Sequence, residues 1–387
     1  VFLILIILLF KDKSDKFMKL IKTAIDFAYH NDNQDIIILG DWCLKDLDDI
    51  LVSVDKYSKV PYHWDDRGKY DRDYGYLTIV YEEKLTQLSQ LLNMIHTTDY
   101  NLSYWRIIIG PWLRYFIDAL FDRYECIKYA DSLGVISSST VFSYDLGDAC
   151  PASFSEFWTE FTTDEWNEIV FSECLKNLDI PYTYINENLY TSIRRKGSKS
   201  NLISFFKEKV VPLINIYSKF ILQFSSGPVI VGAYVPLLKL TKLNLRLKIA
   251  PYFFKPKITF PPSEKDSLLR GQLFIKELSD REFERLLARM IPSFIPKCYV
   301  EDYRKLEKNA SKMLPRNPMS IFTANSYQAD DVFKVWAAKH VNEGVPLVIG
   351  QHGGTFGMAS INQSEEHQIE IAKNYISWGW ADEKTSK

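Results

Sequence analysis

The segment that most constrains the fold is a short apolar run that breaks directly into a glycine-rich turn, VPLVIGQHGGTFG at residues 345–357. Residues 345–349 have the length and aliphatic composition of a buried parallel strand. Glycine has no Cβ and tolerates positive φ, so the turn lets backbone N–H groups approach a ligand closely. Ligands of open α/β sheets bind just beyond the carboxyl ends of the strands. The stretch therefore predicts a site for an anion such as a nucleotide-sugar phosphate, formed by Gln351, His352, Gly353, Gly354 and Thr355. The alternative is a tight strand-to-helix turn whose histidine bonds only to core atoms.

The surrounding sequence predicts a parallel sheet. Residues 319–323 and 375–378 have the pattern of further short strands, and residues 328–342 and 364–373 have that of helices, the second capped by Ser364. This β-α-β-α-β order requires parallel strands joined by right-handed crossovers. Asn325 follows the strand at 319–323 and is a further candidate ligand residue. A doubly wound domain needs more strands, so we expect the sequence to be truncated at its C-terminus and inactive by itself.

Length and composition set wider limits. A chain of 387 residues holds two or three domains, and a net charge of −2 implies no nucleic-acid partner. Its five cysteines are scattered without metal or disulfide spacing, which favours a reducing cytosol, and no cofactor or metal motif is found. The apolar run at residues 1–10 is too short to cross a bilayer. It is either the end of a cut transmembrane helix or translated upstream sequence before a true start at Met18; we favour the second and treat residues 1–17 as a tail.

The first half of the chain carries a second group of candidate site residues. Strands are predicted over residues 35–40 and 59–62, the first followed by Asp41, a candidate for substrate binding. The second is followed by HWDDR at 63–67, in which His63, Asp65 and Asp66 could act as bases or nucleophiles at an anomeric carbon and Arg67 could bind substrate. The alternative is an ordinary turn with a helix cap. A long amphipathic helix follows, with its apolar stripe over residues 77–95.

The next predicted helix, residues 104–129, is apolar on nearly every side yet contains Arg106, Arg114, Asp118 and Asp122. Buried charges persist only when they are paired or hydrogen-bonded. One interpretation is an internal Arg–Asp ladder, in which Arg114 pairs with Asp118. The other is a cleft wall in which Arg106 or Arg114 grips a substrate carboxylate or phosphate, with Arg106 close to the 63–67 loop. The sequence does not decide between them.

The remaining segments define the expected domains. A basic loop at 190–200, a helix over 201–224 and a strand over 228–233 precede a helix over 279–290. Pro292, Pro296 and Pro315 mark a hinge. We therefore expect an α/β domain with helical insertions over 18–314 and the start of a second, incomplete Rossmann-like domain over 315–387.

Several uncommon strings occur together in the chain: LGDWC at 39–43, YHWDDR at 62–67, SYWRIIIGPWL at 103–113, FDRY at 121–124 and GQHGGT at 350–355. In this order they resemble a transferase family from bacterial O-antigen and surface-polysaccharide loci. The resemblance covers residue 18 to the end of the chain. Family members are longer than this chain.

The resemblance implies a glycosyltransferase with two Rossmann-like lobes, similar to the GT-B type. One lobe would hold a glycan or lipid-linked glycan acceptor, and the other a nucleotide-activated sugar. It also implies a cytoplasmic protein in peripheral contact with the inner membrane. The alternatives are a non-catalytic glycan-binding or scaffold protein of the same pathway, and a transferase of a non-sugar group from a nucleotide-activated donor.

Overall fold

The computed structural model describes residues 17–29, 34–45, 57–188, 227–247, 257–275 and 281–381. The apolar run at 1–10, the basic loop at 190–200 and the helix expected over 201–224 lie outside these residues. Within them the chain forms two parallel β-sheets and many helices, so the prediction of an α/β fold with parallel sheets is confirmed.

The first sheet has five parallel strands in the order β3-β2-β1-β4-β5. Its strands are β1 (Met18–Ile21), β2 (Ile36–Ile38), β3 (Tyr57–Lys59), β4 (Ile136–Ser143) and β5 (Tyr182–Asn188). β1 lies at the centre, and its three C-terminal residues pair in register with all three residues of β2. Sequence patterns did not predict β1, because its four residues MKLI are too few to show a periodicity.

The second sheet has four parallel strands in the order β6-β7-β8-β9. They are β6 (Gly227–Ile230), β7 (Pro318–Thr323), β8 (Leu347–Gly350) and β9 (Asn374–Ile376). β7, β8 and β9 are the three strands predicted around the glycine turn. Because β6 belongs to the same sheet, this sheet begins well before Pro315; the division of the chain into domains stays a prediction.

Helices connect and cover both sheets. They are α2 (Ala24–Ala28), α3 (Arg67–His96), α4 (Leu102–Ser132), α5 (Phe154–Glu160), α6 (Asp164–Asn177), α8 (Leu237–Arg246), α9 (Ser267–Gly271), α10 (Glu282–Phe294), α11 (Tyr303–Met313), α12 (Ser326–Ala329), α13 (Asp331–Asn342) and α14 (Gln363–Ile371). Short 3-10 turns are η1 (Asp41–Leu44), η3 (His63–Asp65) and η6 (Lys297–Tyr299). α14 is capped by Asn362, whose side chain accepts from the backbone N–H of Glu365, and not by Ser364 as expected.

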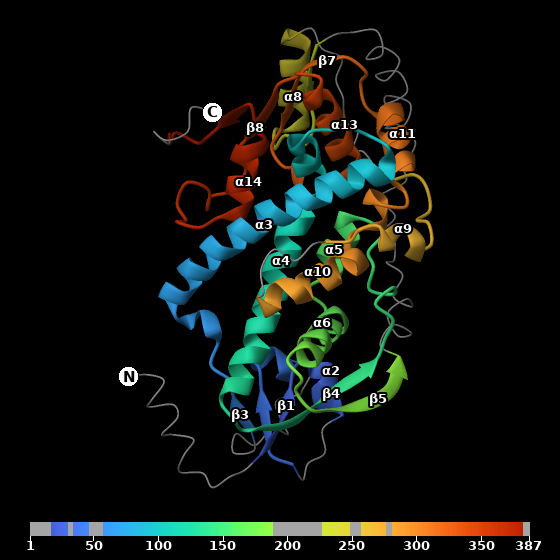
Figure 1. The fold of residues 1–387 in the computed structure, drawn as a ribbon. Helices are drawn as coiled ribbons and strands as arrows, with labels where there is room; N and C mark the ends of the chain where they lie inside the picture. The colour runs from blue at the N-terminus through green and yellow to red at the C-terminus, as the bar shows by residue number, and fades with distance from the viewer. Residues whose placement is uncertain are drawn as a thin grey trace, which may run out of the picture.

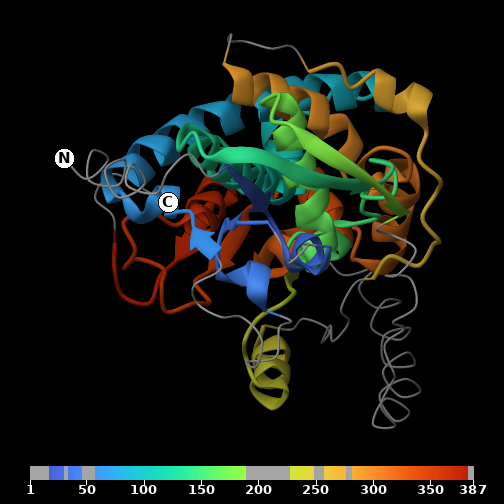
Figure 2. The same cartoon turned by 90° about the horizontal axis from the view of Figure 1, so that it is seen from below.

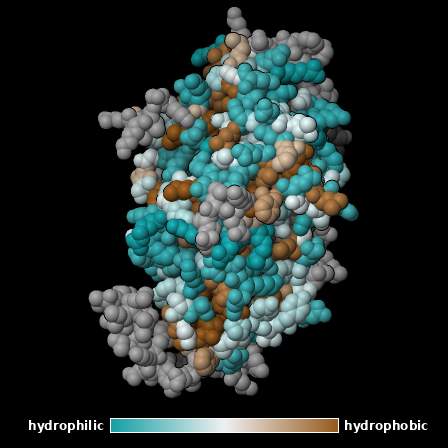
Figure 3. Space-filling model, viewed as in Figure 1, coloured by the Kyte–Doolittle hydropathy of each residue, from teal (hydrophilic) through white to brown (hydrophobic). Residues whose placement is uncertain are grey.

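Helix α4 is the element that joins the two halves. It runs between the sheets in Figure 1 and packs against α6 on the side of the first sheet and against α13 and α14 on the side of the second. Its side chains are buried on most sides, as its sequence predicted, and they belong to one continuous apolar core. α3 lies across α4, and its outer face contributes to the surface in Figure 3, where polar residues predominate and apolar residues are scattered.

Candidate functional site

The glycine turn lies at the carboxyl end of β8, as predicted. The side chain of Gln351 is buried, and its amide nitrogen donates to the carbonyl oxygens of Gly353 at 3.0 Å and Phe356 at 3.1 Å. Its amide oxygen accepts from the backbone N–H of Trp378 at 2.8 Å and from the indole of Trp380 at 2.9 Å. These four bonds use the full capacity of the amide. Gln351 therefore shapes the turn and ties it to the end of β9; direct contact with substrate stays a prediction.

One glycine of the turn is required by its surroundings. Gly357 has φ +76°, and a Cβ added there would come within 2.4 Å of the Trp380 indole. Gly354 differs, because nothing lies within 4 Å of the position its Cβ would take. Gly354 and Thr355 are both exposed. No backbone hydrogen bond from the N–H of either residue is seen in the described part of the chain, so both are candidate donors to a ligand.

His352 is half-buried among aromatic rings at this edge. Its imidazole stacks on Tyr234, with ring centroids 5.8 Å apart, and contacts Phe356 edge-on at 5.0 Å. Burial lowers the pKa of His352, while a hydrogen bond with the backbone of Ala324 opposes the shift, so the imidazole is neutral at pH 7. Its Nδ1 has no hydrogen-bond partner among the described residues. The ring nitrogen that bonds the Ala324 carbonyl carries the single N–H of the neutral imidazole, so Nδ1 is an acceptor that can take up a proton at this position.

The ends of β6 and β7 meet at the same edge. Gly232, just after β6, has φ +64°, and a Cβ there would lie 2.3 Å from Oγ of Ser326. Asn325 donates from Nδ2 to the hydroxyl of Tyr234 at 2.5 Å. Tyr234 in turn stacks on His352, so the structure brings Asn325 and His352 together through one tyrosine.

A cavity of about 210 Å³ opens beside this edge, between α3 and α4 on one side and α12 and α14 on the other. Tyr327 connects the two features, because it lines the cavity and its ring centroid lies 6.3 Å from that of His352. The lining includes aromatic, amide, hydroxyl and charged groups: Thr78, Tyr81, Glu82, Arg106, Pro111, Arg114, Tyr115, Tyr327, Gln328, Gln363, Ser364, Glu366, His367 and Glu370.

Both arginines of the predicted cleft wall line this cavity. Arg106 makes a bidentate ion pair with Glu82, at 2.6 and 2.7 Å. Arg114 donates from Nε to Asp118 at 3.0 Å, which confirms the predicted pair, and from Nη1 to Thr78 at 3.1 Å. The internal pair is therefore confirmed for Arg114, and both arginines line a cavity. Binding of a substrate carboxylate or phosphate by either arginine stays a prediction.

Three polar atoms of this wall are buried without a hydrogen-bond partner among the described residues: Nη2 of Arg114, the hydroxyl of Tyr81 and Nε2 of His367. The centroid of the Tyr81 ring lies 6.0 Å from the guanidinium carbon of Arg106 and 5.9 Å from that of Arg114. Buried donors without partners are costly, so a ligand that accepts hydrogen bonds would be stabilised here.

The predicted proximity of Arg106 to the 63–67 loop is wrong. Arg106 contacts Glu82, which lies fifteen residues beyond Arg67 on α3, or about 22 Å along the helix axis. Sequence spacing could not show this, because it depends on how α3 and α4 are aligned.

Sequence reasoning did not select His367, although it lies in the wall. A Cβ on Gly110 of α4 would lie 2.8 Å from the hydroxyl of Tyr81 and 2.9 Å from Cε1 of His367. Gly110 therefore allows both side chains to approach the helix. Burial and the nearby charge of Arg106 lower the pKa of His367 to about 3, so it is neutral at physiological pH.

Asp118, at the base of the cavity wall, is the most perturbed carboxyl group in this region. Burial raises its pKa to about 6, although the charge and hydrogen bond of Arg114 act in the opposite direction. Such a carboxyl group can exchange a proton near neutral pH. The signal in the sequence was a carboxylate on an otherwise apolar helix, four residues after Arg114.

The predicted 63–67 cluster is divided between core and solvent. His63 is buried, with Nε2 3.2 Å from Oδ1 of Asp122 and Nδ1 3.3 Å from Nζ of Lys69. Asp65, Asp66 and Arg67 are exposed, and Asp66 caps α3 by accepting from the backbone N–H of Lys69 at 3.1 Å. Asp41, the other candidate in this half of the chain, lies just after the carboxyl end of β2 and forms an ion pair with Lys59 at 3.0 Å.

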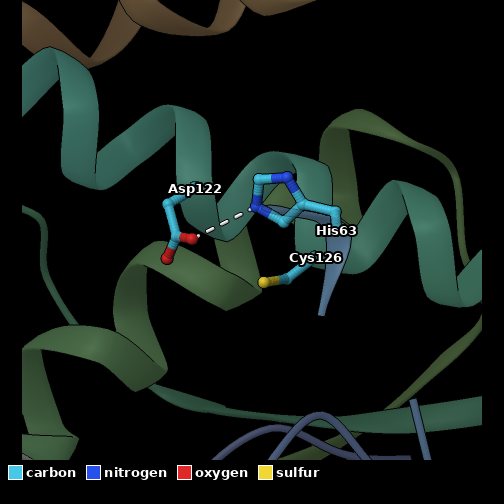
Figure 4. A group of neighbouring side chains, drawn as sticks. All are labelled: His63, Asp122 and Cys126. Atoms are coloured by element: carbon cyan, nitrogen blue, oxygen red, sulfur yellow. Dashed lines mark hydrogen bonds and ion pairs between the residues drawn. The ribbon is translucent and has the colours of Figure 1, made fainter. Parts of the chain in front are cut away.

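Figure 4 shows that His63, Asp122 and Cys126 face one another, with ligand atoms all within 4.8 Å of each other. These atom types suit zinc. However, Asp122 already accepts from Tyr62 at 2.6 Å and from Arg123 at 2.7 Å. Burial raises the pKa of the Cys126 thiol, and the nearby cations Arg123 and Lys69 disfavour a metal ion. The cluster is better explained as a hydrogen-bonded support for the start of α3.

One comparison with known proteins supports the resemblance as far as a transferase family. A family model described as LIC12162 family transferase matches residues 18–387. The chain belongs to this family of transferases. No curated protein and no solved structure matches it. Membership of this family indicates an enzyme that transfers a chemical group, and it does not identify that group.

Proposed function

We propose that this LIC12162 family transferase moves a sugar from a nucleotide-activated donor onto a bacterial surface glycan, such as an O-antigen or another lipopolysaccharide component. The observation that carries the proposal is the connection between the glycine turn after β8 and the adjacent cavity through Tyr327. An anion site beside a pocket of hydroxyl-binding groups matches the two ends of a nucleotide sugar.

The anion site would hold the phosphates of the donor. Backbone N–H groups of the exposed residues Gly354 and Thr355 can donate to phosphate oxygens, and His352 adds a donor when Nδ1 takes up a proton. When the bond between the anomeric carbon and the phosphate oxygen breaks, its electron pair stays on the leaving nucleotide. Donors placed around that oxygen stabilise this developing charge.

The cavity would hold a sugar ring. Tyr115 and Tyr327 offer aromatic faces, and Gln328, Gln363 and Ser364 offer hydrogen bonds to hydroxyl groups. Glu82, Glu366 and Glu370 line it as well, against the two arginines, so the lining itself does not favour a further anion. A volume of about 210 Å³ is below the range typical of drug-sized ligands, which suits a single sugar unit.

Transfer requires a base that takes the proton of the attacking acceptor hydroxyl. The carboxylates Glu82, Glu366 and Glu370 line the cavity itself. The 63–67 cluster lies at the N-terminal end of α3, whereas the middle of α3 lines the cavity. A catalytic part for His63, Asp65 or Asp66 and substrate binding by Asp41 or Arg67 therefore stay predictions. The same holds for a two-lobed GT-B-like organisation, which the strand order of the first sheet supports because doubly wound nucleotide-binding sheets share it.

A donor screen tests this proposal. Full-length protein is incubated with a panel of sugar nucleotides and with non-sugar nucleotide donors, with and without acceptor glycan, and free nucleotide is measured. We expect release from a sugar nucleotide, and a fall of ~10²-fold in the His352→Gln variant. His340→Gln is the matched control. His340 lies in the last turn of α13, before the N-terminal end of β8 and away from the glycine turn, and it pairs with Glu343.

Nucleotide release only from a non-sugar donor would show that the transferred group is not a sugar. Glycan binding without any release would instead indicate the non-catalytic scaffold. An equal fall in nucleotide release in the His352→Gln and His340→Gln variants would show that His352 has no specific role in transfer.

A further inference from the structure

Helix α8 stands apart from the rest of the described chain. It follows β6 and projects outward in Figure 2, where it is yellow. Leu238 and Leu245 are 78% and 64% exposed, and Leu243 and Leu247 are 41% and 47% exposed. Four exposed leucines within ten residues are unusual for a helix that faces only water.

The charge of α8 has one sign. Its sequence LLKLTKLNLR contains Lys239, Lys242 and Arg246 and no acidic residue. All three basic side chains are exposed, and none has an ion-pair partner in the part of the chain that the structure describes. Viewed down the helix axis at 100° per residue, the three basic residues lie within an arc of about 60°. Leu238 and Leu245 lie next to each other on one side of that arc.

This combination fits the interface of an anionic bilayer. Interfacial helices place leucine side chains at the boundary of the acyl chains, while lysine and arginine reach the lipid headgroups. Each basic side chain near an anionic membrane contributes about fivefold to binding. No described helix has the length and hydropathy needed to cross a bilayer, so α8 would lie on the surface.

The position of α8 relates it to the candidate site. Its first residue comes three after Tyr234, the ring that stacks on His352. Tyr234 itself is 68% exposed. A membrane that holds α8 would therefore lie beside the carboxyl edge of the second sheet.

We propose that α8 docks the protein onto anionic phospholipid membranes through Leu238, Leu245 and its three basic side chains. Docking at this edge would bring a lipid-linked acceptor to the cavity. Membrane binding does not depend on the proposed sugar transfer, and each can fail alone.

Vesicle co-sedimentation tests the proposal, with vesicles of phosphatidylcholine alone and of phosphatidylcholine mixed with phosphatidylglycerol. We expect the full-length protein to bind the mixed vesicles, and high salt to weaken that binding. The triple variant Lys239→Gln, Lys242→Gln, Arg246→Gln should lose ~10²-fold in affinity. Leu238→Ser with Leu245→Ser should also release the protein, even at low salt.

Matched controls separate α8 from general charge and exposure. The triple variant Lys308→Gln, Lys312→Gln, Arg316→Gln removes the same charge from a basic groove between α11 and α13. Leu268→Ser removes a leucine on α9 that is 87% exposed. Both should bind mixed vesicles like the parent protein, and circular dichroism confirms that all variants fold.

Three outcomes would overturn the proposal. They are equal binding to both kinds of vesicle, loss of binding in the α11 control but not in the α8 variants, and a dimer without vesicles that the α8 leucine variants dissociate. The last outcome would assign the apolar face of α8 to a second copy of the chain.

Discussion

The Gly110→Ala substitution isolates the contact that shapes the cavity wall. Alanine in place of glycine in the interior of a helix normally stabilises a protein by about 1 kcal/mol, because glycine loses more backbone entropy on folding. At Gly110 the new methyl group would lie 2.8 Å from the hydroxyl of Tyr81 and 2.9 Å from Cε1 of His367. Moving such buried groups costs about 1–3 kcal/mol.

A further cost arises because Pro111 follows Gly110 inside α4. A residue with a Cβ before proline is disfavoured in helical conformation. The packing cost and the gain in backbone entropy together give a loss of about 0–2 kcal/mol, and the effect of Pro111 adds to that loss, so we expect the Gly110→Ala variant to be less stable than the parent protein.

Gly75→Ala is the matched control. Gly75 is an exposed position in α3, and nothing lies within 4 Å of the position of its Cβ. This variant should gain about 1 kcal/mol. Urea unfolding followed by tryptophan fluorescence measures both. Equal stabilisation by the two substitutions would show that Tyr81 and His367 do not contact Gly110 as described.

Three further predictions follow from buried polar groups. Lys22→Met should lower the free energy of unfolding by about 3–5 kcal/mol in urea, because it leaves Asp26 and Glu168 buried without their cation; a loss under about 1 kcal/mol would contradict the buried triad. Asp118 binds its proton more tightly in the folded state, since folding raises its pKa to about 6, so stability should fall by about 3 kcal/mol as pH rises from about 4 past 6, and Asp118→Asn should abolish that part of the pH dependence. The cysteines should react with iodoacetamide only after unfolding, as mass spectrometry can show, because all five are buried and burial raises the pKa of each thiol: Cys43, Cys126, Cys150, Cys174 and Cys298.

Strong periodicity and glycine placement carried most of the correct sequence predictions. The apolar stripes of α3 and α4 located both long helices, and the run before Gly350 located β8. β1 and β5 were not predicted. β1 is only four residues long, and the sequence of β5, YTYINEN, contains few apolar residues. Local patterns predict elements that are long or uniformly buried.

The candidate site was harder to predict because it depends on contacts between distant segments. Gln351 was expected to face a ligand, yet Trp378 and Trp380, more than twenty residues later, occupy its amide oxygen. His367 escaped notice because its importance rests on Gly110 in another helix. In the 63–67 string, one histidine is buried and its carboxylate neighbours are exposed, a division that adjacent positions in sequence cannot reveal.

Hydrogen–deuterium exchange of the full-length protein tests the location of the donor site most directly. The probe is the sugar nucleotide that the release screen identifies. Our account predicts slower exchange on binding at residues 352–358, after β8, and in α12 and the first turn of α14. Slower exchange confined to the carboxyl edge of the first sheet, at Asp41 and residues 63–67, would contradict it and move the donor to the other sheet.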